Sequence, residues 1–368
     1  MLNEMLQANS TGLPQAILPT SELGKLLTLA FQKGASDVHL IVGSPPLLRI
    51  NGELIRTTMP VLTPERSRDF VYSFLSAEQQ SRFKKNLELD ASVEVENVGR
   101  FRVNVHKQRG AIEAAFRTVH PKVQSLQELG LPPIVSDLCR RPNGLVLVTG
   151  RTGMGKTTTI SSMIDQIIHE RRCLVVTIED PIEYLHRHAR GYVKQREVHV
   201  DTHSFAAALM HVLRQNPDVI VIGEMRDLKS ISTALTAAET GHLVLATLHT
   251  PSATQTVDRI IDVFPPEQQE QVRVQLADCL QGVICQELLP RADGTGRVLA
   301  VEVLIATPAV RNLIRTMRTD QVPTAIETGA EYGMVSMDRS IKSLYLDGII
   351  SYETALSRAR DPGVLKSA

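Results

Sequence analysis

A short glycine-rich stretch carries the residues whose types and spacing are best suited to chemistry. Gly150, Gly153 and Gly155 allow the backbone to turn its N–H groups inward around a polyphosphate. Lys156 is placed to reach the β and γ phosphates, and the Thr157 hydroxyl to ligate Mg²⁺. An apolar run precedes the stretch and a helical pattern follows it, which adds the positive end of a helix dipole. The sequence therefore predicts a nucleoside triphosphate site and not a simple glycine-rich turn.

The other residues of this phosphate loop are Arg151, Thr152 and Met154, and Thr158 follows at the predicted start of the helix. All four are candidates for contact with the nucleotide because they belong to the loop or directly follow it. Arg151 and Met154 stand at positions where the pattern accepts any residue, so they do not weaken it.

Carboxylates follow two further apolar runs. Glu179, Asp180 and Glu183 lie at the end of one run, and Glu224 comes shortly after another. Ligands of open parallel sheets bind beyond the carboxyl ends of the strands, so we expect these acids near the nucleotide. An acid in this place can hold the water shell of Mg²⁺ or polarise the attacking water. The alternatives are a solvated acidic turn for the first group and a helix start for Glu224.

Buried strands are indicated in the second half of the chain by continuous runs of Val, Ile and Leu. The runs cover residues 145–149, 174–178, 219–222, 242–247 and 298–305. Strands buried on both faces have this composition, which predicts a parallel sheet covered by helices. One covering helix is indicated by Leu228, Ile231, Leu235 and Ala238, which share a face, and Gly241 would end it.

The first part of the chain instead predicts a small, mainly antiparallel sheet with helices. Strands are expected at residues 37–42, 46–50, 100–107 and 111–118, with a hairpin turn at Asn51-Gly52. Ser21 and Thr63 would each cap a helix. Prolines at 121, 132, 133 and 142 suggest a linker. We therefore expect a leader at 1–20, a first domain at 21–120, a linker at 121–143 and a second domain at 144–368.

Bulk composition narrows the function. Lys+Arg and Asp+Glu both number 40 among 368 residues, and this balance argues against a dedicated nucleic-acid binder. No apolar run approaches the ~20 residues of a membrane-spanning helix, and residues 1–20 lack the features of a signal peptide, so a cytoplasmic location is expected. The four cysteines form no C-x-x-C pair and are expected in the core.

Four ordered boxes make a family resemblance visible. They are residues 150–157 as a Walker A loop, 177–183 as an aspartate box, 223–227 as an atypical Walker B segment and 240–250 as a histidine box. In this order the chain resembles the secretion ATPases of type II secretion and type IV pili, and most closely the PilT-type pilus retraction ATPases. Residues 309–315 likewise resemble a helix of the retraction motors. In that family the phosphate loop usually has Pro and Ser in place of Arg151 and Met154.

The resemblance implies roles for several residues. Glu183 would be the general base or water-positioning residue and Glu224 the Walker B acid near Mg²⁺, although the sequence does not separate the two roles. His242 and His249 would lie near the γ phosphate, with an ordinary structural histidine as the alternative for each.

Arg102 and Arg117 stand where the N-terminal domain of the family offers arginines to bound ATP. The alternative for both is an exposed face of the sheet.

The resemblance also implies an overall organisation and a function. The expected fold is α/β, with a PAS-like α+β N-terminal domain and a RecA-like parallel-sheet P-loop ATPase domain that ends in helices. The family members form homohexameric rings with ATP and Mg²⁺ at the subunit interfaces. They associate peripherally with the inner membrane through a pilus platform protein and draw pilin subunits out of the fibre, and an accessory retraction ATPase is a further partner. No nucleic-acid partner is implied.

Three other functions stay open at this level. The first is a PilU-type accessory retraction ATPase. The second is a RecA-type nucleic-acid motor, which zero net charge and an aromatic content of 4% disfavour. The third is a module that holds ATP without hydrolysing it.

Overall fold

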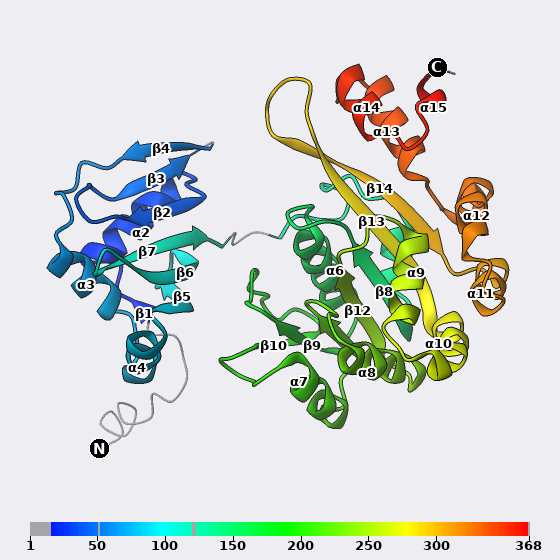
Figure 1. The fold of residues 1–368 in the computed structure, drawn as a ribbon, viewed down its shortest axis with the longest axis horizontal. Helices are drawn as coiled ribbons and strands as arrows, with labels where there is room; N and C mark the ends of the chain where they lie inside the picture. Colours follow the sequence, from blue (N-terminus) through cyan, green and yellow to red (C-terminus); the bar gives the residue numbers. More distant parts are fainter. Residues whose placement is uncertain (1–15, 51, 120–122, 367–368) are drawn as a thin grey trace. The chain divides into compact units, whose positions relative to one another are not determined.

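The computed structural model describes residues 16–50, 52–119 and 123–366. The chain divides into two compact units, Met1–Lys122 with Glu183–Leu185, and Val123–Ile182 with His186–Ala368. Each unit has its own seven-stranded sheet and its own hydrophobic core (Figure 1). This arrangement confirms the α/β class and the two-domain organisation that the sequence predicts. Most of the expected leader lies outside the described residues.

The first unit is built on a sheet with the strand order β1-β5-β6-β7-β2-β3-β4. All neighbouring strands pair antiparallel except β1 and β5, which are parallel. The strands are β1 (Ala16–Ile17), β2 (Asp37–Leu40), β3 (Leu47–Ile50), β4 (Glu53–Arg56), β5 (Glu88–Val95), β6 (Gly99–Gln108) and β7 (Ala111–Thr118). The helices are α2 (Glu22–Gln32), α3 (Pro64–Tyr72) and α4 (Ala77–Asn86).

Local sequence signals account for most of this unit. The Ser21 and Thr63 side chains accept hydrogen bonds from the backbone N–H groups of Gly24 and Arg66, so both predicted helix caps are confirmed. Strands β3 and β4 pair directly on either side of the predicted hairpin turn, of which Asn51 lies outside the described residues. Strand β5 was not predicted, although its buried and exposed positions largely alternate as in a half-buried strand.

The second unit contains the sheet β10-β9-β11-β12-β8-β13-β14. Its strands are β8 (Gly144–Thr149), β9 (Leu174–Glu179), β10 (Tyr192–Glu197), β11 (Val219–Ile222), β12 (Leu243–Leu248), β13 (Leu280–Pro290) and β14 (Arg297–Ile305). The α-helices are α5 (Ile134–Cys139), α6 (Lys156–Glu170), α7 (Phe205–Val212), α8 (Leu228–Glu239), α9 (Ala253–Asp262), α10 (Pro266–Cys279), α11 (Pro308–Arg315), α12 (Val322–Thr328), α13 (Met337–Leu346), α14 (Tyr352–Arg358) and α15 (Gly363–Lys366). Short 3-10 turns are η1 (Leu213–Gln215), η2 (Thr319–Gln321) and η3 (Ala330–Tyr332).

Five adjacent pairs of this sheet are parallel, as predicted, but β13 and β14 form an antiparallel hairpin. The expectation that residues 298–305 belong to a parallel strand was therefore wrong. The apolar composition of β14 indicates that the strand is buried, but it does not show whether the strand runs parallel or antiparallel to its neighbour. The short connection at residues 291–296 makes β14 antiparallel to β13. Strand β13 itself was not predicted.

The segment expected as a linker is in large part packed into the second core. Leu126 and Leu131 are buried, and helix α5 contributes Val135, Leu138 and Cys139 to the same apolar cluster. Pro133 thus stands directly before a packed helix, and the second unit begins at Val123.

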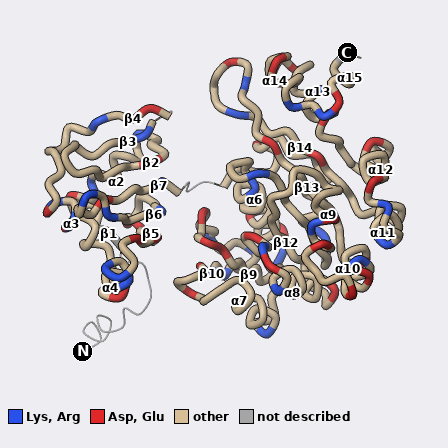
Figure 2. The backbone as a smooth tube through the Cα atoms, viewed as in Figure 1, with Lys and Arg blue, Asp and Glu red and all other residues tan. Residues whose placement is uncertain are grey.

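The positions of the cysteines and the distribution of charge agree with the expectations from composition. All four cysteines are free and buried, which confirms that they are core residues. Figure 2 shows basic and acidic residues spread over both units, in keeping with the balanced charge. Within the described ranges, none of the helices has the length and apolar composition needed to cross a bilayer.

Candidate active site

The phosphate loop connects β8 to α6, and its shape depends on two glycines. Gly150 has a φ of 140°, and a Cβ atom there would lie 2.5 Å from the carbonyl oxygen of Gln286. Gly155 has a φ of 81° and stands directly before the first residue of α6. Both conformations are ones that side-chain-bearing residues rarely adopt. The predicted strand, loop and helix are thus all present.

Lys156 points back into this loop. Lys156 is only 8% exposed, and its Nζ donates hydrogen bonds to the carbonyl oxygens of Gly150 at 2.7 Å and Arg151 at 3.1 Å. A buried ammonium needs such partners, since burying an unpaired charge is costly. The side chain is therefore held where it can exchange backbone carbonyl oxygens for phosphate oxygens.

Strands β13 and β14 support the loop from the other side. The Leu288 N–H donates to Sδ of Met154 at 3.2 Å, and the Arg297 guanidinium donates to the carbonyl oxygen of Gly153 at 3.3 Å. Nε2 of Gln286 donates to the Thr159 hydroxyl at 2.6 Å. The sequence analysis missed this support, because no local signal links the loop to residues more than a hundred positions away.

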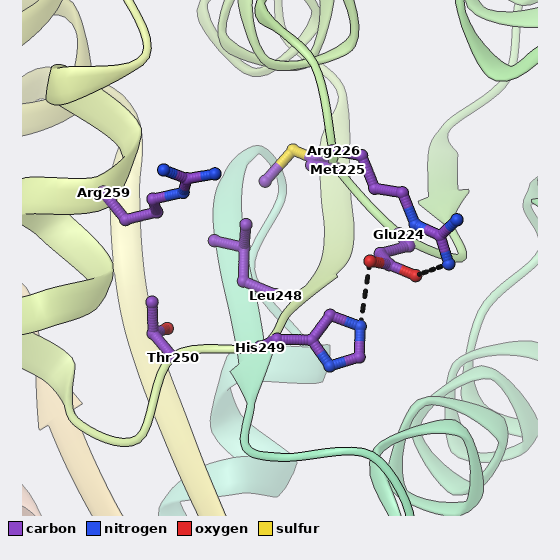
Figure 3. Close-up of a pocket in the computed structure, with 7 residues that line it drawn as sticks. All are labelled: Glu224, Met225, Arg226, Leu248, His249, Thr250 and Arg259. Carbon is purple, nitrogen blue, oxygen red and sulfur yellow. Dashed lines mark hydrogen bonds and ion pairs between the residues drawn. The ribbon is translucent and has the colours of Figure 1, made fainter.

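His249 lies between the phosphate loop and Glu224. Its Nδ1 is 3.4 Å from Nζ of Lys156, and its Nε2 is 2.9 Å from Oε1 of Glu224 (Figure 3). An ammonium can only donate, so Nδ1 must accept and the ring proton belongs on Nε2, from which it is donated to the carboxylate. The imidazole is thus oriented from both sides. His249 therefore connects Lys156, the cation expected to contact phosphate, with Glu224, the acid expected to contact water.

Glu224 is also held by Arg226, which was not among the predicted site residues. Its Oε2 accepts a hydrogen bond from Arg226 at 2.6 Å, and its side chain is 18% exposed. Burial by itself would raise the pKa of Glu224, but the hydrogen bonds from Arg226 and His249 outweigh it and lower the pKa below its ordinary value. The same contact raises the pKa of Arg226. Glu224 is therefore a carboxylate at neutral pH.

A cavity of about 240 Å³ opens beside these groups. Its lining comprises Glu224, Met225, Arg226, Leu248, His249, Thr250 and Arg259. Figure 3 shows Arg259 reaching in from α9 on the side opposite to Glu224. The cavity therefore places two guanidinium groups, an imidazole and a carboxylate around a space large enough for several water molecules or a phosphate.

The acids that follow β9 lie farther along the same edge of the sheet. The strand order puts β12 and β11 between β8 and β9, so three strand spacings, or roughly 14 Å, separate the loop strand from β9. Glu179 accepts hydrogen bonds from the Thr177 hydroxyl at 2.6 Å and from the Gln195 amide at 3.0 Å. Asp180 joins Pro181 through a cis peptide bond, and Glu183 follows in the connection to β10.

His242 is not brought to the phosphate loop. The register pairs Leu243 with Gly144 and Leu248 with Thr149, so His242 precedes β12 at the end of the sheet opposite to the loop. Seven residues of extended chain separate it from His249, a length of roughly 23 Å. Its Nδ1 instead lies 3.0 Å from the carbonyl oxygen of Ala237 at the end of α8. Within one chain, the expected contact of His242 with a phosphate held by the loop is therefore wrong.

Arg102 and Arg117 lie directly opposite each other on β6 and β7. The same register row continues from Arg117 to Asp37 and from Asp37 to Arg49. The Arg117 Nε donates to Asp37 at 3.0 Å. Three arginines and a single acid thus share one row on one face of the sheet, although like charges directly opposite each other are unfavourable.

The residues present fit a magnesium ion bound together with phosphate. Thr157 stands in the first turn of α6 directly after Lys156, where its hydroxyl is the ligand that a phosphate loop offers to Mg²⁺. Both oxygens of Glu224 are engaged by His249 and Arg226, so Glu224 would act on the ion through water. Such a site draws most ligands from phosphate and water. Among the described residues, no group of three or more His, Cys, Asp and Glu side chains is arranged to hold a metal.

Comparison with known proteins identifies the family. The family model described as type II/IV secretion system protein matches residues 18–330. The chain belongs to this family. It is 45% identical over 341 residues to the type IV pilus retractation ATPase PilT of Pseudomonas aeruginosa, covering 93% of this chain and 99% of the relative. The chain is accordingly an ATPase of the secretion family.

Other members of the family agree with this assignment. The crystal structure of the pilus retraction motor PilT with bound ADP superposes with a TM-score of 0.89 at 46% identity, covering 95% of this chain and 99% of that one. The type IV pilus ATPase PilU of Pseudomonas aeruginosa is 39% identical over 338 residues, covering 92% of this chain and 88% of the relative. Both relatives match nearly the whole chain, so their likeness includes the first unit as well as the ATPase unit.

Proposed function

We propose that the chain hydrolyses ATP with Mg²⁺ at the phosphate loop and uses the energy to retract a type IV pilus. The observation that carries the proposal is the connected set Lys156, His249 and Glu224 in a chain that matches a retraction ATPase over nearly its whole length. Lys156 and the loop hold the phosphates, and Thr157 holds the ion. Glu224 and Glu183 orient the attacking water and accept its proton.

His249 is the group in this set that can register the γ phosphate. Its Nδ1 accepts from Lys156, whose ammonium is also the group that contacts phosphate. Hydrolysis changes the position of that ammonium, and the change reaches Glu224 through the imidazole. The link requires no group outside the second unit.

Arg102 and Arg117 are proposed to act on the transferred phosphate. Their row on β6 and β7 concentrates positive charge on a small sheet that has no phosphate loop of its own. Arginines placed around a transferring phosphoryl group neutralise the charge that develops there. The first unit would therefore complete the site on a nucleotide held by the loop of the same or of a neighbouring chain.

As a motor, the chain is proposed to work as a homohexamer at the inner membrane. It would dock on the pilus platform protein from the cytoplasmic side and cooperate with an accessory retraction ATPase. The main retraction role is favoured over the accessory one by the higher identity to PilT, 45% against 39% for PilU. Sedimentation of the purified chain with ATP tests the hexamer.

The deciding experiment combines enzymology with complementation. The purified chain should hydrolyse ATP, and its gene should restore twitching motility to a strain that lacks its main retraction ATPase. The Lys156→Ala variant serves as the inactive control in both assays. ATPase activity without restored motility would overturn the main retraction role and favour the accessory one. Absence of hydrolysis by a folded hexamer would overturn the motor assignment.

A further inference from the structure

Arg360, close to the C-terminus, joins two segments of the second unit. One arm of its guanidinium donates to Oε2 of Glu302 at 2.6 Å, and the other donates to the carbonyl oxygen of Pro251 at 2.9 Å. Glu302 belongs to β14, whereas Pro251 lies in the connection between β12 and α9. A single side chain thus ties the antiparallel edge of the sheet to the loop that follows His249.

The acid in this contact is almost completely enclosed. Glu302 is 3% exposed, and its Oε1 accepts a hydrogen bond from the N–H of Ala253 at 2.8 Å. Ala253 is the first residue of α9, so the carboxylate also satisfies a backbone donor that the helix leaves unpaired. A carboxylate buried to this degree requires a cation, and Arg360 supplies it.

Arg360 is itself fixed by its backbone. The N–H groups of Arg360 and Asp361 donate to the two oxygens of Asp338 at 2.7 and 2.9 Å. Asp338 lies in the first turn of α13, which packs on β14. The guanidinium therefore starts from an anchored piece of chain and not from a loose terminus.

The consequence for the site concerns His249. Pro251 is only two residues beyond His249, and the Thr250 hydroxyl lies 2.7 Å from that of Thr256 on α9. The connection is thus held at Thr250, Pro251 and Ala253. The imidazole must meet Lys156 on one side and Glu224 on the other, so a shift of this connection moves it out of line with one of them.

We propose that Arg360 is a positioning residue for ATP hydrolysis, because it fixes the connection that carries His249 by bridging Glu302 and the Pro251 carbonyl. The inference rests on the role of His249 given under the proposed function. The planar guanidinium presents donors from two different nitrogens in a rigid fork that reaches both acceptors, whereas a lysine donates from a single nitrogen on a flexible stem. A lysine at this position keeps the charge beside Glu302 but loses the bridge.

The test uses the full-length chain and separates positioning from stability. Arg360→Lys should lower kcat for ATP by about tenfold, with the Kd for ATP within about twofold of the wild type and a melting temperature close to it. The double variant Glu302→Gln/Arg360→Met removes both charges, so it should keep the fold but show the same loss of kcat. Arg339→Gln, a charge change at an exposed arginine on α13, serves as the matched control and should leave kcat unchanged.

A double-mutant cycle with His249→Ala decides the route of the effect. If Arg360 acts through His249, Arg360→Lys should cause no further loss of kcat once His249 is absent. Multiplying effects would overturn the inference, as would a loss of kcat that only follows the loss of melting temperature across the Arg360 variants. Wild-type turnover in Arg360→Lys, with His249→Ala impaired, would overturn this inference alone. Wild-type turnover in His249→Ala would overturn the role proposed for His249 and this inference with it.

Discussion

Lys156 is the side chain on which nucleotide affinity should depend most. Its ammonium is already held inside the loop by the Gly150 and Arg151 carbonyl oxygens, so little reorganisation is needed when phosphate arrives. Lys156→Ala should weaken ATP binding by ~10² or more, because a charge-assisted contact to phosphate is lost while the backbone remains. Calorimetric titration measures the change. The exposed Lys229 on α8 provides the control Lys229→Ala, and equal affinities in the two variants would refute the assignment.

Glu183 and Glu224 should matter for turnover more than for binding. A Gln substitution keeps the size of either side chain and removes its charge, so kcat should fall by ~10² or more while ATP still binds. Steady-state ATPase assays together with nucleotide titration separate the two effects. The substitution that lowers kcat more identifies the group nearer to the attacking water, and wild-type turnover in both variants would contradict a catalytic role for either residue.

His186 should make the stability of the second unit depend on pH. It contacts the Ser161 hydroxyl on α6 at 3.0 Å, and burial lowers its pKa from 6.5 to about 4. Below pH 6.5 the His186 imidazole binds a proton in the unfolded chain, whereas in the folded chain it stays neutral until the pH approaches 4. Stability is therefore complete above that pH and falls by up to about 1.4 kcal/mol per pH unit as the pH drops toward 4. Calorimetry at pH 7.5 and 5.5 should show a smaller drop for His186→Gln than for the wild type or for the exposed control His211→Gln.

Much of the site can be predicted from sequence at this scale, and the exceptions have different causes. The phosphate loop and the acid after β11 are local patterns at strand ends, so they are visible without a fold. Gln286 acts through a contact whose partner is known only once the strands are ordered. Arg226 is only two residues from Glu224, but it lies in an irregular segment whose geometry the sequence does not show. The contact predicted for His242 was wrong for another reason. His242 does adjoin the predicted strand, but it lies at the end of that strand opposite to the phosphate loop.

At the scale of elements, the local sequence predicts helix caps and strands, but it does not predict the order of the strands in the sheet. The insertion of β12 between the strands that carry the phosphate loop and Glu224 is what makes His249 a link between them. Nothing in the composition of β12 distinguishes a central position from an edge. The same limit explains why β13, β10 and the antiparallel direction of β14 escaped the sequence analysis.

Helix α11, which resembles a helix of retraction motors, is attached through its arginines to the end of α10. Arg311 donates to the carbonyl oxygens of Ala277, Asp278 and Ala306, and Arg315 pairs with Asp278. These contacts satisfy carbonyl groups that a helix end leaves unpaired. Arg311→Ala should therefore lower the free energy of unfolding by roughly 1–3 kcal/mol, measured by urea titration. Arg318→Ala in the same region is the control, and an unchanged midpoint for Arg311→Ala would show that the arginine has no structural part.

At the scale of the whole molecule, the division of labour between the units can be tested by truncation. The second unit has a complete core from Val123 onward, whereas a chain begun near residue 140 would lack α5 and expose the apolar face that it covers. A chain starting at Val123 should bind ATP with nearly native affinity but hydrolyse it poorly, because Arg102 and Arg117 are missing. Arg102→Ala in the full chain should reproduce that low kcat without unfolding.

Mixed hexamers test whether Arg102 acts on ATP bound by its own chain or by a neighbouring chain. Arg102→Ala chains and Glu183→Gln chains are each expected to be inactive alone, yet their mixture contains sites that combine the intact half of each. Recovery of part of the activity would show action between chains. No recovery in verified mixed hexamers would restrict the arginines to their own chain, and a fully active chain starting at Val123 would remove any catalytic part for the first unit.

The support of the phosphate loop by β13 also has a consequence for protein synthesis. The loop and its lysine leave the ribosome early, but β13 pairs with β8 only after more than a hundred further residues have been made. The Gln286 and Leu288 contacts that shape the loop therefore form late. A nascent chain that ends before Leu280 leaves one side of β8 unpaired and lacks a finished pocket. ATP bound at the loop should therefore stabilise the completed chain, because the site that binds it is not finished earlier.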